Sequence, residues 1–164
     1  MDNERLAEIA AAVAAELKRG AAYKSVPLEA ARLLIAEVEK KAAEMGVNAV
    51  AAVSDSGAHP VAVECMDGAF IASFDVALNK AYTVVALKMS THELKRLAQP
   101  GGSLYGIQHT NGGRIVVFGG GDPLIYGGEI IGGLGVSGGT EEQDTALSAY
   151  GASRLADIMD KLRK

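Results

Sequence analysis

Three histidines, His59, His92 and His109, are the side chains of this chain with the widest chemical use. No two of them have the spacing at which neighbouring histidines share a metal ion, and the one cysteine, Cys65, has no second cysteine beside it. A structural zinc site closed within one chain needs four such ligands, so this pattern argues against one. One histidine is enough where a metal group takes only one or two protein ligands. Each histidine can therefore be either a surface residue or a metal ligand.

Cys65 falls late in a segment that we expect to be a strand, and no histidine neighbours it. A nucleophilic cysteine needs a base or a helix N-terminus to lower its pKa. We therefore interpret Cys65 as a small core residue. A single cysteine also excludes an intramolecular disulfide and indicates a reducing compartment.

A glycine-rich run over residues 132–139 leads into a capping-box pattern, Thr-Glu-Glu-Gln, at residues 140–143. A helix start offers free backbone N–H groups, so Gly138, Gly139 and Thr140 are candidates for binding a carboxylate of a ligand. The alternative is that the glycines let a strand lie directly against another backbone. The sequence leaves both interpretations open.

Two charged residues in predicted helices, Lys80 and Asp144, are further candidates for ligand binding. Lys80 lies close to the apolar face of its helix. It either extends its amine from the edge of that face or pairs with an acidic group of a ligand. No acid–base pair at a recognisable spacing accompanies these residues, which favours a binding protein over an enzyme.

The elements that carry these residues follow from periodicity and turn signals. Apolar residues at spacings of three and four predict helices over about residues 2–20, 27–45, 70–88 and from 140 to near the end, with a short helix after Ser90. The third has an apolar side that consists of Phe70, Phe74, Leu78, Ala81 or Tyr82, and Val85. Hairpin turns are predicted at residues 55–57, 111–112 and 127–128. Tight hairpins require antiparallel pairing, so the expected fold is α+β with a five-stranded antiparallel sheet.

Composition and charge argue against several classes of function. The chain has 164 residues, enough for one domain, and carries a net charge of −4 with its lysines and arginines scattered. It has no basic stripe with interleaved aromatics, which argues against a nucleic-acid partner. No apolar stretch is long enough to span a membrane, and the acidic N-terminus is unlike a secretory signal. We expect a cytoplasmic protein.

Four short motifs occur in order along the chain. They are VAAVSDSGAHPVA (50–62), MDGA (66–69), NKAYT (79–83) and IIGGLGVSGG (130–139), the last followed by Gln143-Asp144. Together they resemble the haem-binding family typified by GlcG, HbpS and the C-terminal domain of PduO. Residues 104–124 are most similar to the PduO C-terminal branch.

The resemblance implies a profilin-like α-β-α sandwich over residues 27–164, a homo-oligomer, and binding of haem or another tetrapyrrole, with haem degradation as a further activity. One or two of His59, His92 and His109 become candidate haem iron ligands. The PduO branch also implies an accessory role beside cobalamin-dependent diol metabolism, without the adenosyltransferase activity, because that domain is absent. The turn at 56–58 has Ser-Gly-Ala where two glycines are commoner, and axial ligation differs among members, so no single ligand is carried over.

Two other functions stay open. One is an enzyme of small-acid or aldehyde metabolism that uses the glycine-rich pocket with Lys80 and Asp144 as polar groups. The other is a non-catalytic accessory protein of a bacterial microcompartment. Residues 1–20 lie outside the family core and resemble the encapsulation peptides that dock cargo to a microcompartment shell, which would place the protein in the lumen. An ordinary packing helix is the alternative. Its apolar stripe is Leu6, Ile9, Val13 and Leu17.

Overall fold

An antiparallel sheet of four strands organises the chain, in the order β2-β1-β4-β3. The computed structural model describes residues 3–163, and within them the side chains of residues 4–15 and 23–163. The elements are α1 (Asn3–Ala22), α2 (Leu28–Glu44), β1 (Val50–Asp55), β2 (Pro60–Cys65), α3 (Ile71–Leu87), α4 (Thr91–Leu97), the 3-10 turns η1 (Ile107–His109) and η2 (Asn111–Gly113), β3 (Gly121–Tyr126), β4 (Glu129–Ser137) and α5 (Glu141–Leu162).

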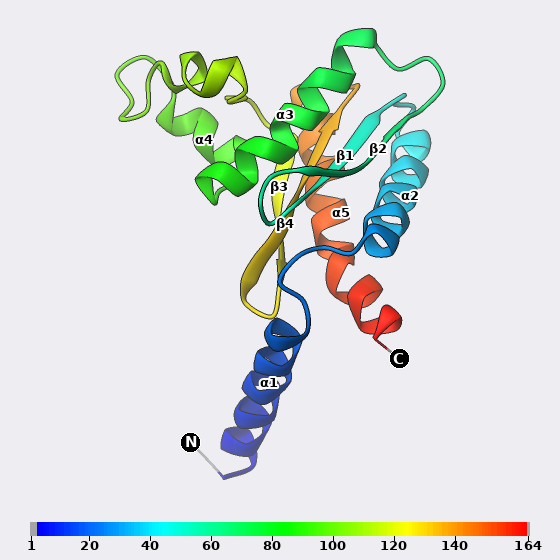
Figure 1. Cartoon of the computed structure of the whole chain (residues 1–164), viewed down its shortest axis with the longest axis vertical. Helices are drawn as coiled ribbons and strands as arrows, with labels where there is room; N and C mark the ends of the chain where they lie inside the picture. The colour runs from blue at the N-terminus through cyan, green and yellow to red at the C-terminus, as the bar shows by residue number, and fades with distance from the viewer. Residues whose placement is uncertain (1–2, 164) are drawn as a thin grey trace.

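Helices cover both faces of this sheet (Figure 1). Strand side chains alternate between the two faces. Val53 and Leu134 pack with α2 and α5 in the larger core, whereas Ala52 packs with Ala77 and Ala81 of α3. The expected α+β class with helices on both sides of an antiparallel sheet is therefore confirmed.

The sheet has four strands rather than the five that we predicted. Asn111 and Gly112 do adopt the positive φ angles of a hairpin turn, 51° and 65°. However, 3-10 turns occupy this region, and the backbone that follows bonds to helix α3 instead of to a strand. The Thr83 hydroxyl accepts a hydrogen bond from the N–H of Val116 (3.0 Å) and lies 3.3 Å from the carbonyl oxygen of Arg114. The turn predicted at Asn111-Gly112 therefore forms, but the segments on either side of it pair with no strand.

The glycines of β4 let α3 lie directly on the strand. A Cβ atom added at Gly135 would collide with the carbonyl oxygen of Ala77, and one at Gly133 with that of Ala81. For these two glycines the close-packing interpretation is therefore correct. The contact also fixes the height of α3 above the sheet, and with it the position of Lys80.

Close packing on β4 changes which side of α3 is buried. Small residues and Lys80 face the sheet, whereas Phe70 is 72% exposed and Phe74 is also exposed. Phe70 and Phe74, which the spacing places on the apolar side of this helix, therefore do not pack on the sheet, because the glycine strand leaves no space there for a large ring. Cys65 is exposed as well, at the end of the edge strand β2, so its assignment to the core is also wrong.

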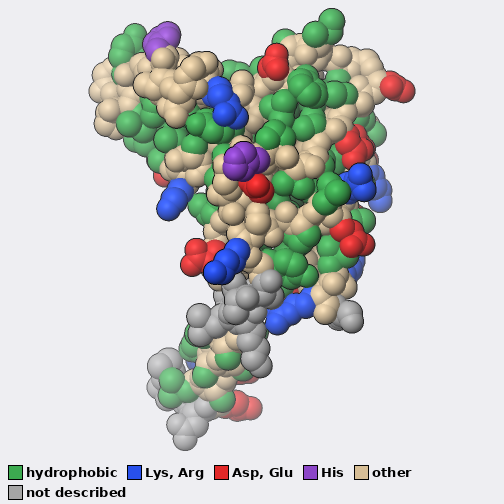
Figure 2. All heavy atoms as spheres, viewed as in Figure 1, with side chains coloured by type: hydrophobic (Ala, Val, Ile, Leu, Met, Phe, Trp, Pro, Cys, Tyr) green, Lys and Arg blue, Asp and Glu red, His purple; other side chains and the backbone are tan. Residues whose placement is uncertain are grey.

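Helix α1 extends away from the rest of the molecule (Figure 1), and its described side chains also project from the body in the space-filling view (Figure 2). Leu6, Ile9 and Val13 of its predicted stripe are exposed, and the side chain of Leu17 lies outside the described part. The segment that joins α1 to α2 is held to the sheet, since the N–H of Val26 donates to the carbonyl of Ile131 (2.8 Å). No helix in the described range 3–163 is both long and apolar enough to cross a membrane.

Candidate functional site

A hollow of about 330 Å³ lies where the starts of α3 and α5 meet the end of β4. We call it the α3–α5 hollow. Its apolar walls come from Phe70 and Val76 on the α3 side and from Phe118 in the loop before β3. Both rings reach solvent, with Phe70 72% and Phe118 41% exposed. Exposed aromatic faces around a concave surface are typical of a binding site for a flat, largely apolar molecule.

The predicted residues Gly138, Gly139 and Asp144 line this hollow. The N–H of Gly139 donates to Oδ1 of Asp144 at 2.9 Å. Thr140 forms the predicted capping box with Gln143: its Oγ1 accepts from the Gln143 N–H, and its own N–H donates to the Gln143 side chain. The N–H groups of Gly139 and Thr140 are therefore already hydrogen-bonded within the chain.

Helix α3 begins differently at the same hollow. Its N-cap residue is Phe70, and no side chain caps its first turn. The N–H groups at a helix start and the helix dipole favour a negative group. This end of the hollow therefore suits a carboxylate better than the capped start of α5.

Lys80 lies beneath the hollow and is fully buried. Its Nζ atom donates to Oδ2 of Asp144 at 2.9 Å and to the carbonyl of Val136 at 2.7 Å, and lies 5.0 Å from the centre of the Phe118 ring. Burial lowers the pKa of Lys80, and the Asp144 carboxylate opposes that change. Neither alternative from the sequence describes this lysine, because its amine is paired inside the protein.

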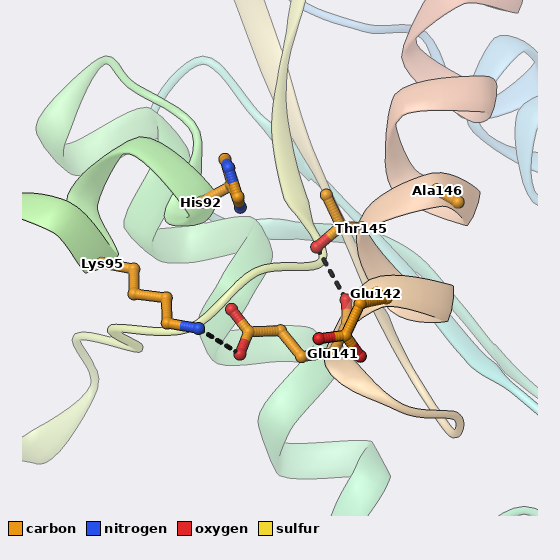
Figure 3. A pocket seen from close by; sticks show the side chains of 6 residues that line it. All are labelled: His92, Lys95, Glu141, Glu142, Thr145 and Ala146. Carbon is orange, nitrogen blue, oxygen red and sulfur yellow. Dashed lines mark hydrogen bonds and ion pairs between the residues drawn. The ribbon is translucent and has the colours of Figure 1, made fainter.

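A second hollow of about 310 Å³, the α4–α5 hollow, lies next to the first. Figure 3 shows His92 and Lys95 on its α4 side and residues of the first turns of α5 on the other. Glu141 lines both hollows. Its Oε2 accepts a hydrogen bond from Lys95 Nζ at 2.7 Å, and its Oε1 accepts from the Gly119 N–H at 2.9 Å. These two bonds lower the pKa of Glu141, so its side chain stays a carboxylate at neutral pH.

The three histidines lie in different places. His92 is an exposed residue of α4 that lines the α4–α5 hollow. His59 lies in the β1–β2 turn, where its Nδ1 is 3.4 Å from Oδ1 of Asp55 and its side chain is 81% exposed. This turn is at the opposite end of β1 from the residue that pairs with Ser137, which lines the α3–α5 hollow. His109 ends η1 and is exposed. Of the three, only His92 lines either of the two hollows, and it lines the one that shares Glu141 with the candidate site. Across the described part of the chain, no group of three or more His, Cys, Asp or Glu residues is arranged to hold a metal ion.

Sequence reasoning missed four residues of this region: Phe70, Phe118, Lys95 and Glu141. The chain has only three phenylalanines, and this small number could have drawn attention to Phe70 and Phe118 as site residues. The Lys95–Glu141 pair joins residues 46 positions apart, and no local pattern indicates it.

Comparison with known proteins gives consistent matches. The sequence model of the haem-degrading, HbpS-like family matches residues 26–153. An uncharacterized 15.0 kDa protein encoded between dhaT and dhaS in Citrobacter freundii is 49% identical over 124 residues, which are 76% of this chain and 87% of that protein. The corrinoid adenosyltransferase PduO of Salmonella typhimurium is 42% identical over 109 residues. These cover 66% of this chain and 32% of PduO, so the match spans about a third of that enzyme.

The fold matches as well. A crystal structure of a PduOC–haem complex superposes with a TM-score of 0.76 and 34% identity, covering 79% of this chain and 94% of the other. The motifs at 50–62, 66–69, 79–83 and 130–139 had indicated this relationship. The chain belongs to the HbpS-like family of haem-degrading proteins, to which the C-terminal domain of PduO is related.

Proposed function

We propose that this protein binds haem, or a closely related tetrapyrrole, in the α3–α5 hollow. The observation that carries the proposal is the pair of exposed rings, Phe70 and Phe118, beside the uncapped start of α3. Apolar walls suit the faces of a porphyrin, and a helix start suits its propionate groups. A relative of the same fold has been crystallised as a haem complex, which supports the same ligand class.

The residues of the hollow fit the porphyrin ring better than they fit the iron. No histidine is among the described residues that line it. His92 is the best-placed of the three candidates, since its own hollow shares Glu141 with the α3–α5 hollow. When bound, haem would supply an iron centre whose oxygen and electron-transfer chemistry depends on its axial ligand.

Absorption spectra of the protein titrated with hemin test the proposal, with cobalamin titrated in parallel. We expect a saturable Soret band with hemin, and a shift or loss of that band in His92→Ala. The matched variants His59→Ala and His109→Ala should leave it unchanged. If all three variants bind hemin with the wild-type spectrum, histidine ligation is wrong. If hemin gives no saturable band at all, the haem proposal is wrong.

We also propose that the protein forms a homo-oligomer. Phe70, Ile71 and Phe74 form an apolar patch at the start of α3, and Ile71 is 97% exposed. A hollow of about 330 Å³ is at the small end of the range for small-molecule pockets, so a large flat ligand would keep one face uncovered. A second copy placed over this patch would cover both. Light scattering that shows only a monomer of 16.9 kDa at tens of micromolar would contradict this.

The alternative of a small-acid or aldehyde enzyme receives less support. It required Lys80 and Asp144 as polar groups of the pocket, but Lys80 is fully buried and Asp144, which lines the hollow, is already paired with it. A substrate would have to displace a buried ion pair to use either of them.

A microcompartment role remains a second proposal, carried by α1. Its exposed residues Leu6, Ile9 and Val13 offer an apolar stripe that the chain itself leaves uncovered. We propose that this helix docks to a shell protein, which would place the protein in the lumen of a compartment within the cytoplasm. Fusing residues 1–20 to a fluorescent protein and co-expressing shells tests this: diffuse fluorescence would contradict the proposal, and fluorescence confined to the shells would support it.

A further inference from the structure

Two buried hydroxyl groups line the α3–α5 hollow. They belong to Ser73 of α3 and to Ser137 at the end of β4, which are only 4% and 8% exposed. Their Oγ atoms lie 3.1 Å apart, within hydrogen-bond distance. We propose that this pair, together with the uncapped start of α3, binds one carboxylate of the ligand, so that the hollow selects tetrapyrroles with free carboxylate groups. This inference rests on the proposed function and names the part of the ligand that the hollow recognises.

The serine pair has one hydroxyl proton more than it uses. Each hydroxyl can donate one proton and can also accept, so a single bond between Ser73 and Ser137 occupies only one of their two protons. Neither hydroxyl bonds to any other group in the described part of the chain. A buried donor without an acceptor is costly. An acceptor atom of a ligand in the hollow would remove this cost.

The start of α3 adds further unused donors beside Ser73. The N–H of Ser73 itself donates to the carbonyl of Phe70 at 3.0 Å. The N–H groups of Ile71 and Ala72 come earlier in the helix and have no acceptor among the described residues 3–163. Ala72 lines the hollow together with Ser73. Because the N-terminal end of a helix also carries partial positive charge, these donors favour an acceptor that is negatively charged.

Two acidic side chains also line the hollow, but both are already paired. Asp144 lies 2.9 Å from the amine of Lys80, and Glu141 lies 2.7 Å from that of Lys95. Each carboxylate also accepts a backbone N–H. A lysine therefore balances the charge of each acid, and the hydrogen-bonding groups that remain unused around Ser73 are donors. This arrangement suits a ligand carboxylate and does not suit an amine.

Such a subsite distinguishes between classes of tetrapyrrole. Haem and metal-free porphyrin carry propionate groups, whereas the side chains of a corrin such as cobalamin are uncharged amides. A hydrogen bond to a charged acceptor is stronger than one to a neutral acceptor. We therefore expect the hollow to bind a porphyrin with free propionates more tightly than its ester or a corrin. No bond to iron enters this recognition, so a metal-free porphyrin is a suitable probe.

Fluorescence titrations with metal-free protoporphyrin and with its dimethyl ester, both in the same dilute detergent, test the inference. The double variant Ser73→Ala/Ser137→Ala removes both hydroxyls and leaves neither unpaired, so the fold should tolerate it. Ser54→Ala is the control, because Ser54 is a buried serine that bonds to the carbonyl of Ala81 outside the hollow. We expect the double variant to bind protoporphyrin about tenfold more weakly and the ester as wild type does. The control should bind both ligands like wild type.

Nuclear magnetic resonance locates the carboxylate on the protein. The amide protons of Ile71 and Ala72 should move further downfield with protoporphyrin than with the ester, as expected for N–H groups that donate to an anion. Equal shifts with both ligands would contradict the subsite. So would a double variant that binds protoporphyrin like wild type, or that loses affinity for acid and ester alike; porphyrin binding itself would then still stand. If wild type binds neither ligand, the proposed function fails and this inference fails with it.

Discussion

The amine of Lys80 lies 2.9 Å from Oδ2 of Asp144, and Oδ1 of the same carboxylate accepts the N–H of Gly139. A residue in the middle of α3 is thus joined to the loop that forms the floor of the α3–α5 hollow. The lysine is fully buried and acts from beneath the site, whereas Asp144 itself lines the hollow and is held in place by the lysine.

Breaking this pair should destabilise the protein strongly. Lys80→Met leaves the Asp144 carboxylate buried without its cation, which we expect to lower the free energy of unfolding by about 3–5 kcal/mol. Asp144→Asn keeps an acceptor for Gly139, and in the double variant no unpaired charge remains. Urea denaturation should therefore give a double variant less destabilised than the sum of the two single variants. Additive losses would show that the two groups are not coupled.

The contact of α3 with β4 predicts a steric effect. Gly135→Ala places a methyl group against the carbonyl of Ala77 and should cost about 1–3 kcal/mol of stability, because neither backbone segment can yield cheaply. Gly112→Ala is the comparison: it has a positive φ but no atom near its added Cβ. That change should cost roughly 1 kcal/mol, from the left-handed backbone alone. Thermal melts that rank Gly112→Ala as the more damaging would contradict the close packing.

Asp122 predicts a pH dependence. Burial raises its pKa, while a hydrogen bond donated by the Ser148 hydroxyl opposes the change. The folded state therefore holds this proton more tightly than the unfolded state, whose pKa is about 3.9. Its contribution to stability is present at low pH and is lost as pH rises from that value through the folded pKa.

Asp122→Asn should remove this contribution while keeping an oxygen that accepts from Ser148. We expect the variant to gain stability over wild type as pH rises from about 4 to 7, measured as the difference between their urea midpoints. Ser148→Ala should steepen the dependence, since it deletes the bond that opposes the shift. An unchanged difference across this pH range would show that Asp122 titrates normally.

Much of the scaffold around the site was predictable because local rules decide it. Thr140 and Gln143 form a capping box that their spacing predicts, and residues 127–128 turn the β3–β4 hairpin. Asn111 shows the limit of such rules. The predicted turn conformation at Asn111 is correct because it depends on local residues. The segment that follows, however, bonds to Thr83 of α3 instead of to a strand, and Thr83 lies far away in the sequence.

The positions of the site's polar side chains were harder to predict from the sequence than the helices and turns around them. Gly138, Gly139 and Asp144 were placed correctly in a pocket, because the glycine run before a helix start is a local signal. The burial of Lys80 was not foreseen, since it depends on the glycines of β4 bringing α3 down onto the strand. His59, His92 and His109 looked equivalent in the sequence, and only the folded chain separates His92 from the others.

Helix α1 gives a prediction about modularity. Deleting residues 1–20 should leave the melting temperature unchanged within about 2 °C, because Leu6, Ile9 and Val13 are exposed and their removal uncovers little core. An isolated helix of this length is marginal in water, so it should be stable mainly against a partner. Aggregation of the truncated chain, or a fall of many degrees, would mean that the stripe packs within the protein or its oligomer.

Filling the α3–α5 hollow tests the central claim most directly. Ala72 is an exposed α3 residue that lines the hollow, whereas Ala86 is exposed on the same helix away from it. The same substitution, alanine to tryptophan, at each position gives a matched pair. In a hemin titration followed at the Soret band, Ala72→Trp should weaken binding by about tenfold or more, the factor corresponding to roughly 1.4 kcal/mol, while Ala86→Trp binds like wild type. Wild-type affinity in Ala72→Trp, with the fold intact by circular dichroism, would show that haem does not occupy this hollow.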